Sequence, residues 1–361
     1  MEMNVDVVVV GSAASGLACA IQAKENGIGS VLVLEKMGVP GGCSRFAGGI
    51  MGFDSPVQKR MGYYYSADQA FKDLIRNLNW YVDAKLVRKW LLRSGEDIQW
   101  LQDMGVKFEE ARAWNDRPDV NRHSYHVITP KAPGQFVGYL IVEAMKTRCR
   151  ELGIDIMCRT RATSLIQDRS GRVTGVKAET ADGGELIVHA DNVMLATGSM
   201  GANREMMREY FKTDEFDDIA IMSSFPFLTG DGHGMATAAG AAKGKMSIVP
   251  IGPHNHFKGA SEVVGAVARR PNTIKINTNG ERFVDESLCS ESEFGWFLSA
   301  AVDYQPNKMS YTLLDASILQ HMTDKRDEEI FLVDFGATEG KHPRRGRGVC
   351  GMPCFAAAGD R

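Results

Sequence analysis

The sequence predicts an α/β protein whose main domain has a parallel sheet with an inserted β-meander. Three observations lead to this prediction. A valine run at 7–10 passes through a glycine loop into a helical pattern and then into a second apolar run at 31–34. Short strand patterns separated by turn residues follow at 154–189, and a buried strand comes after them at 192–199. Buried strands that alternate with a helix are typical of a parallel sheet with crossover helices.

The first element is the stretch VVVVGSAASGL, at 7–17. Its consecutive valines fit a strand covered on both faces, because branched side chains suit a pleated, buried surface. Leu17, Ala20 and Ile21 then follow at helical spacing, and Asn26-Gly27 is a helix stop. A strand, a turn and a helix in this order form the context in which a glycine-rich loop binds the phosphates of a dinucleotide.

The loop itself supplies the chemistry for a dinucleotide. Gly11 allows a sharp turn, Gly16 allows close packing of helix and strand, and the free N–H groups of the first helical turn attract a pyrophosphate. Glu35 lies about twenty residues further on, where a carboxylate accepts hydrogen bonds from ribose hydroxyls, and its charge argues against a 2′-phosphate. Ala13 replaces the middle glycine of the usual pattern, and its methyl group narrows the space in which the backbone approaches the diphosphate. The alternative is a βαβ crossover without a ligand.

Composition limits the classes of function. The chain has 361 residues, of which 44% are hydrophobic and 24% charged, and its net charge is −3. These proportions fit a globular protein, and the length favours two domains. The charge balance gives no case for nucleic-acid binding, and no apolar run is long enough for a membrane segment. The chain begins directly with a strand pattern, which predicts a cytoplasmic protein.

The cysteines predict neither a disulfide framework nor a metal site. There are 7 of them, scattered along the chain, and most are expected to be reduced. Cys350 and Cys354 lie close together, but no second pair of cysteines or histidines is placed to complete four ligands.

A second glycine-dense loop, PGGCSRFAGGIMG, occupies 40–52. So many small residues either form a flexible linker or let a flat ligand lie against the backbone. Phe46, Ile50 and Met51 favour burial, which argues for the second interpretation.

Helical patterns dominate the next region. Ser66 opens a capping box and a first helix. A second helix is predicted through 86–91, and Ser94 is predicted to start a third. Residues 106–135 have little periodicity, which predicts an irregular surface excursion, and a further helix is predicted at 136–153.

The meander is predicted from strands at 154–158, 163–167, 173–178 and 185–189, which are joined by glycine turns. The buried strand at 192–199 closes it, and ligand contacts are expected where that strand ends.

Two features follow the meander. Thr229-Gly230-Asp231-Gly232 precedes a small-residue helix at 235–242, so this turn either faces a ligand or simply caps the helix. Residues 245–335 carry their own strand and helix patterns, with a hairpin turn at 277–280, and are predicted to form a second domain.

Four motifs occur in a specific order: GSAASG with Glu35-Lys36, GGCSRFAGG, LATGSMGAN and TGDGHGMATAAGA, followed by NTNGERFVDES. Together they resemble the FAD-dependent oxidoreductase 2 family, which includes soluble fumarate reductases, succinate dehydrogenase flavoproteins, urocanate reductases and ketosteroid dehydrogenases. The resemblance covers about 5–55 and 136–340. No single motif would be sufficient, but the set is specific.

The resemblance implies a domain organisation and a cofactor. It implies a Rossmann-like FAD-binding domain at 1–244 with a helical insertion at about 66–135, a partial α+β capping domain at 245–340, and an atypical tail at 341–361. Some relatives bind FAD covalently through a histidine of the second motif. Cys43 stands at that place here, so the resemblance implies non-covalent FAD.

The resemblance also implies contacts with the cofactor. The first loop would hold the pyrophosphate, the Glu-Lys pair the adenosine side, and the second loop the flavin ring. One meander residue would meet the adenine, the end of the buried strand the dinucleotide, and the Thr-Gly-Asp turn the isoalloxazine and the substrate. In that order the residues are Gly11, Ser12, Ala13, Ala14, Ser15 and Gly16, then Glu35 and Lys36, then Gly42, Cys43, Ser44, Ala47, Gly48 and Gly49, then Ala162, then Ala196, Thr197 and Gly198, and finally Thr229, Gly230 and Asp231.

The chain departs from the fumarate reductases at positions that act on the substrate. Ser290 stands where that subgroup has its general-acid arginine, and Gly252 or Pro253 stands where it has a histidine for the substrate carboxylate. His254 and His256 are out of register. Fumarate is therefore a poor candidate substrate, and no catalytic residue is assigned.

The resemblance implies an FAD-dependent oxidoreductase that acts on the C=C or CH–CH bond of a small organic acid or ketone, with hydride transfer through flavin N5. A separate electron donor or acceptor is expected, because no haem or iron–sulfur cysteine pattern is present. The substrate, the donor and the oligomeric state stay open.

The alternative is a truncated, catalytically inactive FAD-binding remnant. Family members return to the FAD domain with a further glycine-rich segment, whereas this chain ends in HPRRGRGVCGMPCFAAAGDR, an abrupt change of composition. A frameshifted or truncated end is the corresponding hypothesis.

Overall fold

The protein is represented by a computed structural model. It describes residues 1–77, 82–113, 123–128, 136–211, 225–244, 273–286, 301–302, 304–306 and 310–313. The chain divides into two compact units, and each is considered by itself. The first unit comprises Met1–Phe216 and Ser223–Ile248, and the second comprises Asp217–Met222 and Val249–Arg361.

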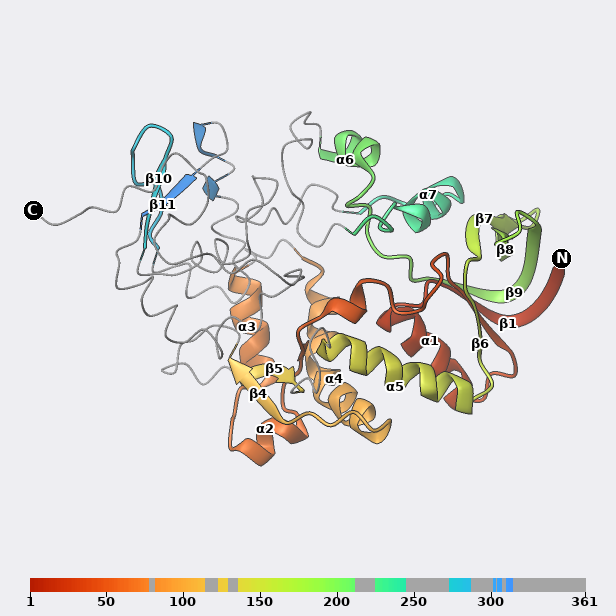
Figure 1. Ribbon diagram of the computed structural model, residues 1–361, viewed down its shortest axis with the longest axis horizontal. Coiled ribbons are helices and arrows are strands. Elements are labelled where there is room, and N and C mark those ends of the chain that lie inside the picture. The colour runs from red at the N-terminus through yellow and green to blue at the C-terminus, as the bar shows by residue number, and fades with distance from the viewer. Residues whose placement is uncertain are drawn as a thin grey trace, which may run out of the picture. The chain divides into compact units, whose positions relative to one another are not determined.

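The first unit contains helices, a large sheet and a small sheet (Figure 1). Its strands are β1 (Glu2–Val10), β2 (Val31–Leu34), β3 (Ile50–Met51), β4 (Glu110–Ala113), β5 (His123–Val127), β6 (Asp155–Met157), β7 (Arg161–Gln167), β8 (Val173–Glu179) and β9 (Glu185–Leu195). Its helices are α1 (Ala14–Glu25), the 3₁₀ helix η1 (Gly42–Phe46), α2 (Pro56–Met61), α3 (Ala67–Asn77), α4 (Ala84–Asp103), α5 (Val137–Glu151), α6 (Arg204–Phe211) and α7 (Asp231–Ala238).

The large sheet has six strands in the order β6-β2-β1-β9-β8-β7. Strand β1 pairs in parallel with β2 on one side and with β9 on the other. Val10 lies opposite Leu34 and Leu195, so these three strands end together at one edge of the sheet. The loops that follow them therefore meet at the same edge, which is where open α/β sheets bind ligands.

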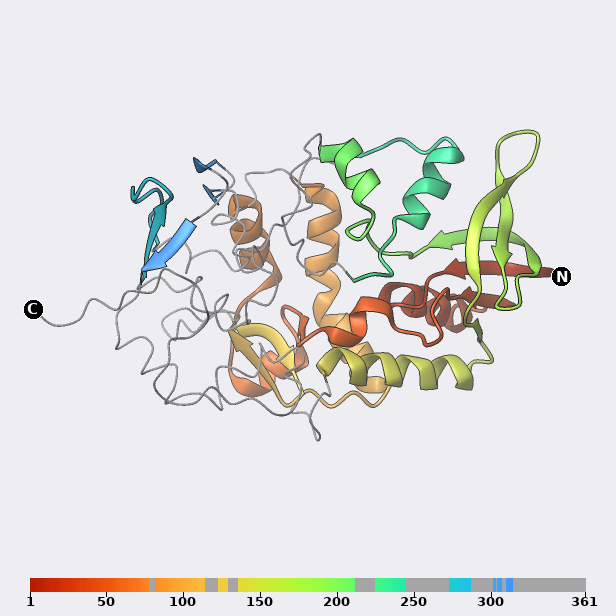
Figure 2. The same cartoon turned by 45° about the horizontal axis from the view of Figure 1, so that its top comes forward.

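The valine run is buried on both faces of this sheet. Val7 and Val9 belong to a core that includes residues of α1 and α5. Val8 and Val10 belong to a second core, formed with the meander strands and Met235. The hairpin of β7 and β8 continues the sheet beyond β9, and in Figure 2 this yellow-green hairpin lies on the opposite side of β1 from α5. The predicted α/β fold with a parallel sheet and an inserted meander is confirmed.

Two details of the predicted meander are wrong. Residues 154–158 were expected to join the antiparallel strands, but β6 pairs in parallel with β2 at the edge of the sheet. Residues 185–189 and 192–199 were expected to form separate strands, but β9 runs without a break from Glu185 to Leu195. Strand β9 pairs with β8 from Glu185 to His189 and with β1 from Ile187 to Leu195. One long strand thus joins the meander to the parallel sheet.

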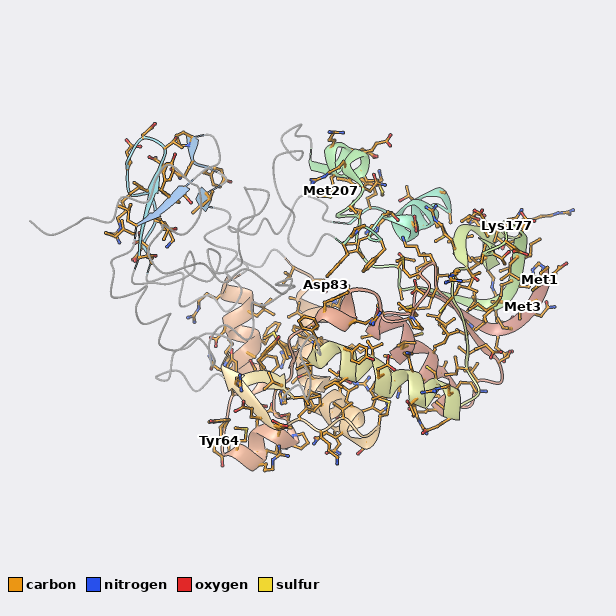
Figure 3. The ribbon with its side chains drawn as sticks, viewed as in Figure 1. Met1, Met3, Tyr64, Asp83, Lys177 and Met207 are labelled. Atoms are coloured by element: carbon orange, nitrogen blue, oxygen red, sulfur yellow. The ribbon has the colours of Figure 1, made fainter. Side chains whose placement is uncertain are left out.

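The predicted break at Ser94 is also wrong, because α4 continues from Ala84 to Asp103. The helix begins after its N-cap Asp83, which is labelled in Figure 3. Ser94 is buried, accepts a hydrogen bond from Phe53 N at 2.9 Å and donates one to Leu91 O at 2.7 Å. A Cβ added at Gly95 would lie 2.5 Å from Phe53 O. The small Ser-Gly pair lets a neighbouring loop approach the helix and does not end it.

The region 106–135 is less irregular than predicted. Strands β4 and β5 lie in it and form a three-stranded sheet with β3 in the order β3-β5-β4. Phe108, Tyr125 and Val127 are buried in the core that includes the helices α1 and α5. Hydrophobic burial therefore orders a segment whose sequence lacks strong periodicity.

In the second unit, β10 (Ile274–Asn277) pairs antiparallel with β11 (Ser310–Leu313). The predicted turn follows β10, and Gly280 N donates to Asn277 O at 3.0 Å. Several residues singled out in the sequence lie outside the described residues: Gly252, Pro253, His254, His256, Ser290, Cys350, Cys354 and the tail 341–361.

Candidate dinucleotide-binding site

A pocket lies at the edge of the large sheet where β1, β2 and β9 end. It is lined by Val10, Gly11, Ser12, Ala13, Leu34, Glu35, Lys36, Gly42, Cys43, Thr160, Arg161, Ala162, Ala196, Thr197, Gly198, Phe227, Leu228 and Asp231. Segments far apart in the sequence therefore contribute to one cavity within the first unit.

The turn between β1 and α1 requires glycine at two positions. Gly11 has φ +103°, and a Cβ added there would lie 2.3 Å from Ala196 O. A Cβ added at Gly16 would lie 1.9 Å from Gly11 O. Both glycines thus allow the start of α1 to lie directly against the ends of β1 and β9.

The first turn of α1 presents backbone amides without an acidic partner. Its N-cap, Ala13, has no side chain to cap the helix, and no acidic residue lies in the first turn. Ala14 N donates to Ser44 Oγ at 3.1 Å, which joins the second glycine loop to the first. The N-cap makes no side-chain hydrogen bond, and the positive end of the helix dipole favours an anion at this end of α1.

Ala13 fits because the neighbouring loop leaves room for its methyl group. Ala13 forms an isolated parallel bridge with Gly41. A Cβ added at Gly42 would lie 3.3 Å from the Cβ of Ala13, so any larger residue at 42 would crowd the methyl group. The departure from the usual glycine pattern is therefore accommodated by a glycine in the second loop.

Glu35 is fixed against the turn. It is only 6% exposed, and its Oε2 accepts hydrogen bonds from Ser12 N at 3.0 Å and from Ser12 Oγ. Its Oε1 accepts from Met37 N at 2.8 Å. Glu35 lines the same pocket as the turn residues Gly11, Ser12 and Ala13. This is the arrangement that recognition of a ribose beside a diphosphate requires.

A charged network lies on another wall of the pocket. Lys36 Nζ donates to Thr229 Oγ1 at 2.7 Å and to Asp231 Oδ2 at 2.8 Å. Arg161 Nη2 donates to Asp231 Oδ1 at 2.8 Å. Burial alone would raise the pKa of Asp231, but the hydrogen bonds from Arg161 and Lys36 outweigh it, so the pKa lies below its usual value.

Helix α7 begins at this network and is packed closely against the end of β9. Its N-cap, Gly230, has φ +75°, and its N–H donates to Ser199 O at 3.2 Å. A Cβ added at Gly232 would lie 2.1 Å from Thr197 Oγ1. The first turn of α7 thus has a fixed position at the pocket.

An aromatic stack connects the second glycine loop to the pocket wall. The rings of Phe46 and Phe225 stack at 4.9 Å between centroids, and those of Phe225 and Phe227 stack at 5.3 Å. Phe227 lines the pocket, whereas Phe46 belongs to η1. The stack keeps these two segments together.

The predicted cofactor residues fall into two groups. Those that line the pocket are Gly11, Ser12, Ala13, Glu35, Lys36, Gly42, Cys43, Ala162, Ala196, Thr197, Gly198 and Asp231. Those that do not line it are Ala14, Ser15, Gly16, Ser44, Ala47, Gly48, Gly49, Thr229 and Gly230.

Sequence reasoning missed Val10, Leu34, Thr160, Arg161, Phe227 and Leu228. All six lie within two residues of a predicted contact, so extending each motif at its ends would have found them. Arg161 immediately precedes Ala162, and Leu228 immediately precedes Thr229. The motifs located the right loops but not their full extent.

The described residues contain neither a membrane-spanning helix nor a metal-binding cluster. No helix in that part of the chain combines the length and apolar character needed to span a membrane. Within the same residues, no group of three or more His, Cys, Asp or Glu side chains could hold a metal ion.

Comparison with known proteins places this geometry in a family. The chain is 29% identical over 327 residues to vinyl phenol reductase of Lactiplantibacillus plantarum, and the match covers 88% of this chain and 62% of that protein. It is 32% identical over 323 residues to urocanate reductase of Eggerthella lenta, with 88% of this chain and 51% of that protein covered. A solved open conformation of a flavocytochrome c3 fumarate reductase matches with a TM-score of 0.65 and 25% identity, over 90% of this chain and 55% of that one.

The chain therefore spans about half to two thirds of the length of these relatives. Residues 6–342 match the sequence profile of the family described as FAD binding domain. The chain belongs to this family of FAD-binding flavoproteins.

Proposed function

We propose that the chain is an FAD-dependent oxidoreductase that reduces an activated C=C bond, or catalyses the reverse reaction, in a small organic acid or ketone. When bound, the flavin supplies the hydride chemistry through its N5. The observation that carries the proposal is the convergence of Glu35 with Gly11, Ser12 and Ala13, the turn that leads into α1, on one pocket. A glycine cradle, helix-end amides and a ribose-binding acid are the donor and acceptor set that FAD requires.

The residues of the pocket have distinct proposed roles. The glycine loop at 11–16, which includes the start of α1, would bind the diphosphate, and Glu35 would accept from the ribose hydroxyls. Ala162, at the start of β7, would contact the adenine through its backbone. The second glycine loop would pass beside the flavin ring, with Cys43 near it and no covalent link. We also propose that the nine predicted contacts that do not line the pocket support the residues that do.

The names of the relatives support the substrate class. Vinyl phenol and urocanate each have a C=C bond conjugated with an aromatic ring, and fumarate has one between two carboxyl groups. A conjugated C=C bond accepts a hydride more readily than an isolated one, because the developing carbanion is delocalised. We propose the same substrate feature here, together with a separate electron donor or acceptor.

A visible absorption spectrum of the purified chain tests this proposal. We expect a yellow protein whose flavin bands bleach with dithionite and return when an electron acceptor is added. Acid precipitation should release the flavin into the supernatant, because the proposed binding is non-covalent. A colourless protein that gains no flavin bands after incubation with FAD would contradict the proposal and support an inactive remnant.

A further inference from the structure

We propose that Lys36 and Arg161 are positioning residues that hold Asp231 and the first turn of α7 at the pocket and give this wall a net positive charge toward the diphosphate of the cofactor. The inference rests on the proposed function, because it concerns the same cofactor site. It assigns Lys36 a role different from the adenosine contact expected from sequence, and it assigns a role to Arg161, which the sequence did not single out.

The geometry of the network is a closed circuit of hydrogen bonds. The Thr229 hydroxyl accepts from Lys36 Nζ and donates to Asp231 Oδ1 at 3.1 Å. Asp231 Oδ2 accepts from the same ammonium group, while Oδ1 also accepts from Arg161. Both carboxylate oxygens are thus occupied by cations, and the side chain of Asp231 is only 12% exposed.

The circuit joins three elements that are distant in sequence. Lys36 follows β2, Arg161 is the first residue of β7, and Asp231 is the first residue of α7. The start of α7 is also held by the Gly230–Ser199 backbone hydrogen bond and by its close packing on Thr197. The ion pairs therefore tie α7 to two strands with which it shares no backbone hydrogen bond in the described residues.

The charge of the network has a consequence for an anionic ligand. Two cations and one carboxylate leave a net charge of about +1 on this wall, and opposite charges attract strongly where solvent is partly excluded. If either cation were neutralised, the wall would carry no net charge while the Glu35 carboxylate stays in the same pocket. The cations thus offset an acid that would otherwise repel the diphosphate.

The two cations should contribute unequally. The side chain of Lys36 is 23% exposed, whereas that of Arg161 is 58% exposed and more strongly screened by water. Lys36 also holds Thr229 as well as Asp231. Its removal should therefore weaken cofactor binding more than removal of Arg161.

Titration of FAD into the purified chain and its variants, followed by quenching of flavin fluorescence, tests the inference. We expect Lys36→Met to weaken FAD binding at pH 7.5 by about ten- to a hundredfold, and Arg161→Met by about three- to tenfold. Lys36→Arg should keep most of the affinity. Lys243→Met is the matched control, because Lys243 forms an exposed ion pair with Glu209 and does not line the pocket.

A double variant separates an electrostatic role from a merely structural one. In Lys36→Met the wall carries no net charge. Adding Asp231→Asn returns its net charge to about +1 through Arg161 and should recover part of the lost affinity at the same pH. A merely structural role predicts no recovery, because the second change removes a further charged partner from the network.

The outcomes are distinguishable. If Lys36→Met and Arg161→Met both bind FAD as tightly as the unmodified chain, the inference is wrong while the proposed function stands. Weak binding by Lys36→Met that the added Asp231→Asn does not partly restore would also overturn it, since a purely structural defect has that signature. If the unmodified chain itself binds no FAD, the proposed function fails and the inference with it. Arg161→Met covers the case in which Lys36→Met does not fold, because Arg161 is mostly exposed.

Discussion

The pocket wall around Asp231 and the core around His126 both bury polar side chains, but they treat charge in opposite ways. At the pocket, two cations keep Asp231 ionised, and the pKa of its carboxyl is lowered. In the core, burial lowers the pKa of His126 to about 4, so the ring is neutral. Burial disfavours the charged form of both side chains. Asp231 stays charged because two cations pair with it, whereas His126 has no oppositely charged partner among the described residues and is neutral.

The hydrogen bonds of His126 show how the neutral core is built. His126 Nδ1 lies 2.9 Å from Ser124 O, and because a carbonyl can only accept, this nitrogen carries the proton. Nε2 lies 2.6 Å from Ser55 Oγ and accepts from that hydroxyl. Ser55 is also the N-cap of α2 and accepts from Gln58 N at 3.1 Å. The ring therefore links β5 to the start of α2 without any charge.

The largest effect should come from breaking the close approach at the pocket turn. Gly16→Ala would place a methyl group 1.9 Å from Gly11 O, and the backbone there cannot move without disturbing β1 and β9. We expect a loss of about 3 kcal/mol or more in the free energy of unfolding, together with loss of FAD binding. Urea denaturation and FAD titration measure the two effects.

Gly234→Ala is the matched control for this change, because a Cβ added at Gly234 meets nothing within 4 Å. It should leave stability unchanged or slightly higher, since alanine favours a helix. Equal stability of Gly16→Ala and the unmodified chain would show that the turn is not closely packed.

The second-largest effect should be a loss of stability in acid that results from the buried, neutral His126. The pKa of His126 is about 4 in the folded chain, whereas a solvated histidine in the unfolded chain has its ordinary pKa of 6.5, so the unfolded chain binds more protons between these values. The contribution of His126 to the free energy of unfolding is therefore fully present above pH 6.5. It is lost as the pH drops from about 6.5 to about 4, which lowers the free energy of unfolding by roughly 3 kcal/mol. Thermal or urea unfolding at several pH values measures this.

The variant His126→Gln should be less stable at pH 7 but should lose most of that acid sensitivity. His189→Gln serves as the control, because His189 is an exposed partner of Glu2. If His126→Gln kept the full acid sensitivity, other groups would be responsible for it.

A smaller effect is expected at the acid of the pocket. Glu35→Gln keeps the shape of the side chain but removes the charge that faces Ser12. We expect FAD binding to weaken by about tenfold, which corresponds to about 1.4 kcal/mol, because charge-assisted hydrogen bonds are stronger than neutral ones. Glu25→Gln, on the surface beside Arg148, should bind FAD normally. Unchanged binding by Glu35→Gln would remove the carboxylate from cofactor recognition.

The smallest effect lies outside both regions, at the start of α3. The Ser66 half of the predicted capping box is present, because Ser66 Oγ accepts from Gln69 N at 3.2 Å, and the side chain of Gln69 donates to Asp73 Oδ1 at 3.0 Å. Ser66→Ala should cost about 1 kcal/mol in the free energy of unfolding and leave FAD binding unchanged. A loss of FAD affinity in this variant would show that the helical insertion is coupled to the pocket.

The two regions also differ in how far the sequence predicts them. The β1–α1–β2 unit follows from local patterns, since the valine run, Gly11 and Gly16 lie within a few residues of one another. The packing around His126 was missed because it joins β5 to the start of α2 over a distance of 71 residues in sequence. The Ser94-Gly95 pair was predicted to start a new helix. In the structure these small residues lie inside α4, where they allow close packing of a neighbouring loop.

The same limit applies within the pocket. The strand ends that line it were predicted, because each has its own motif. The partners Lys36, Arg161 and Asp231 lie 70 to 195 residues apart in sequence, so their ion pairs could not be read from spacing. Pairing across such distances is set by the sheet order, which the sequence pattern indicates only in part.

Competition for the FAD site tests the central claim most directly, which is that the turn amides and Glu35 bind the ADP half of the cofactor. Bound FAD should be displaced by ADP, far more weakly by 2′-phospho-ADP, and hardly at all by FMN, which lacks the adenosine. Displacement by FMN as strong as by ADP, or no displacement by ADP, would contradict the account.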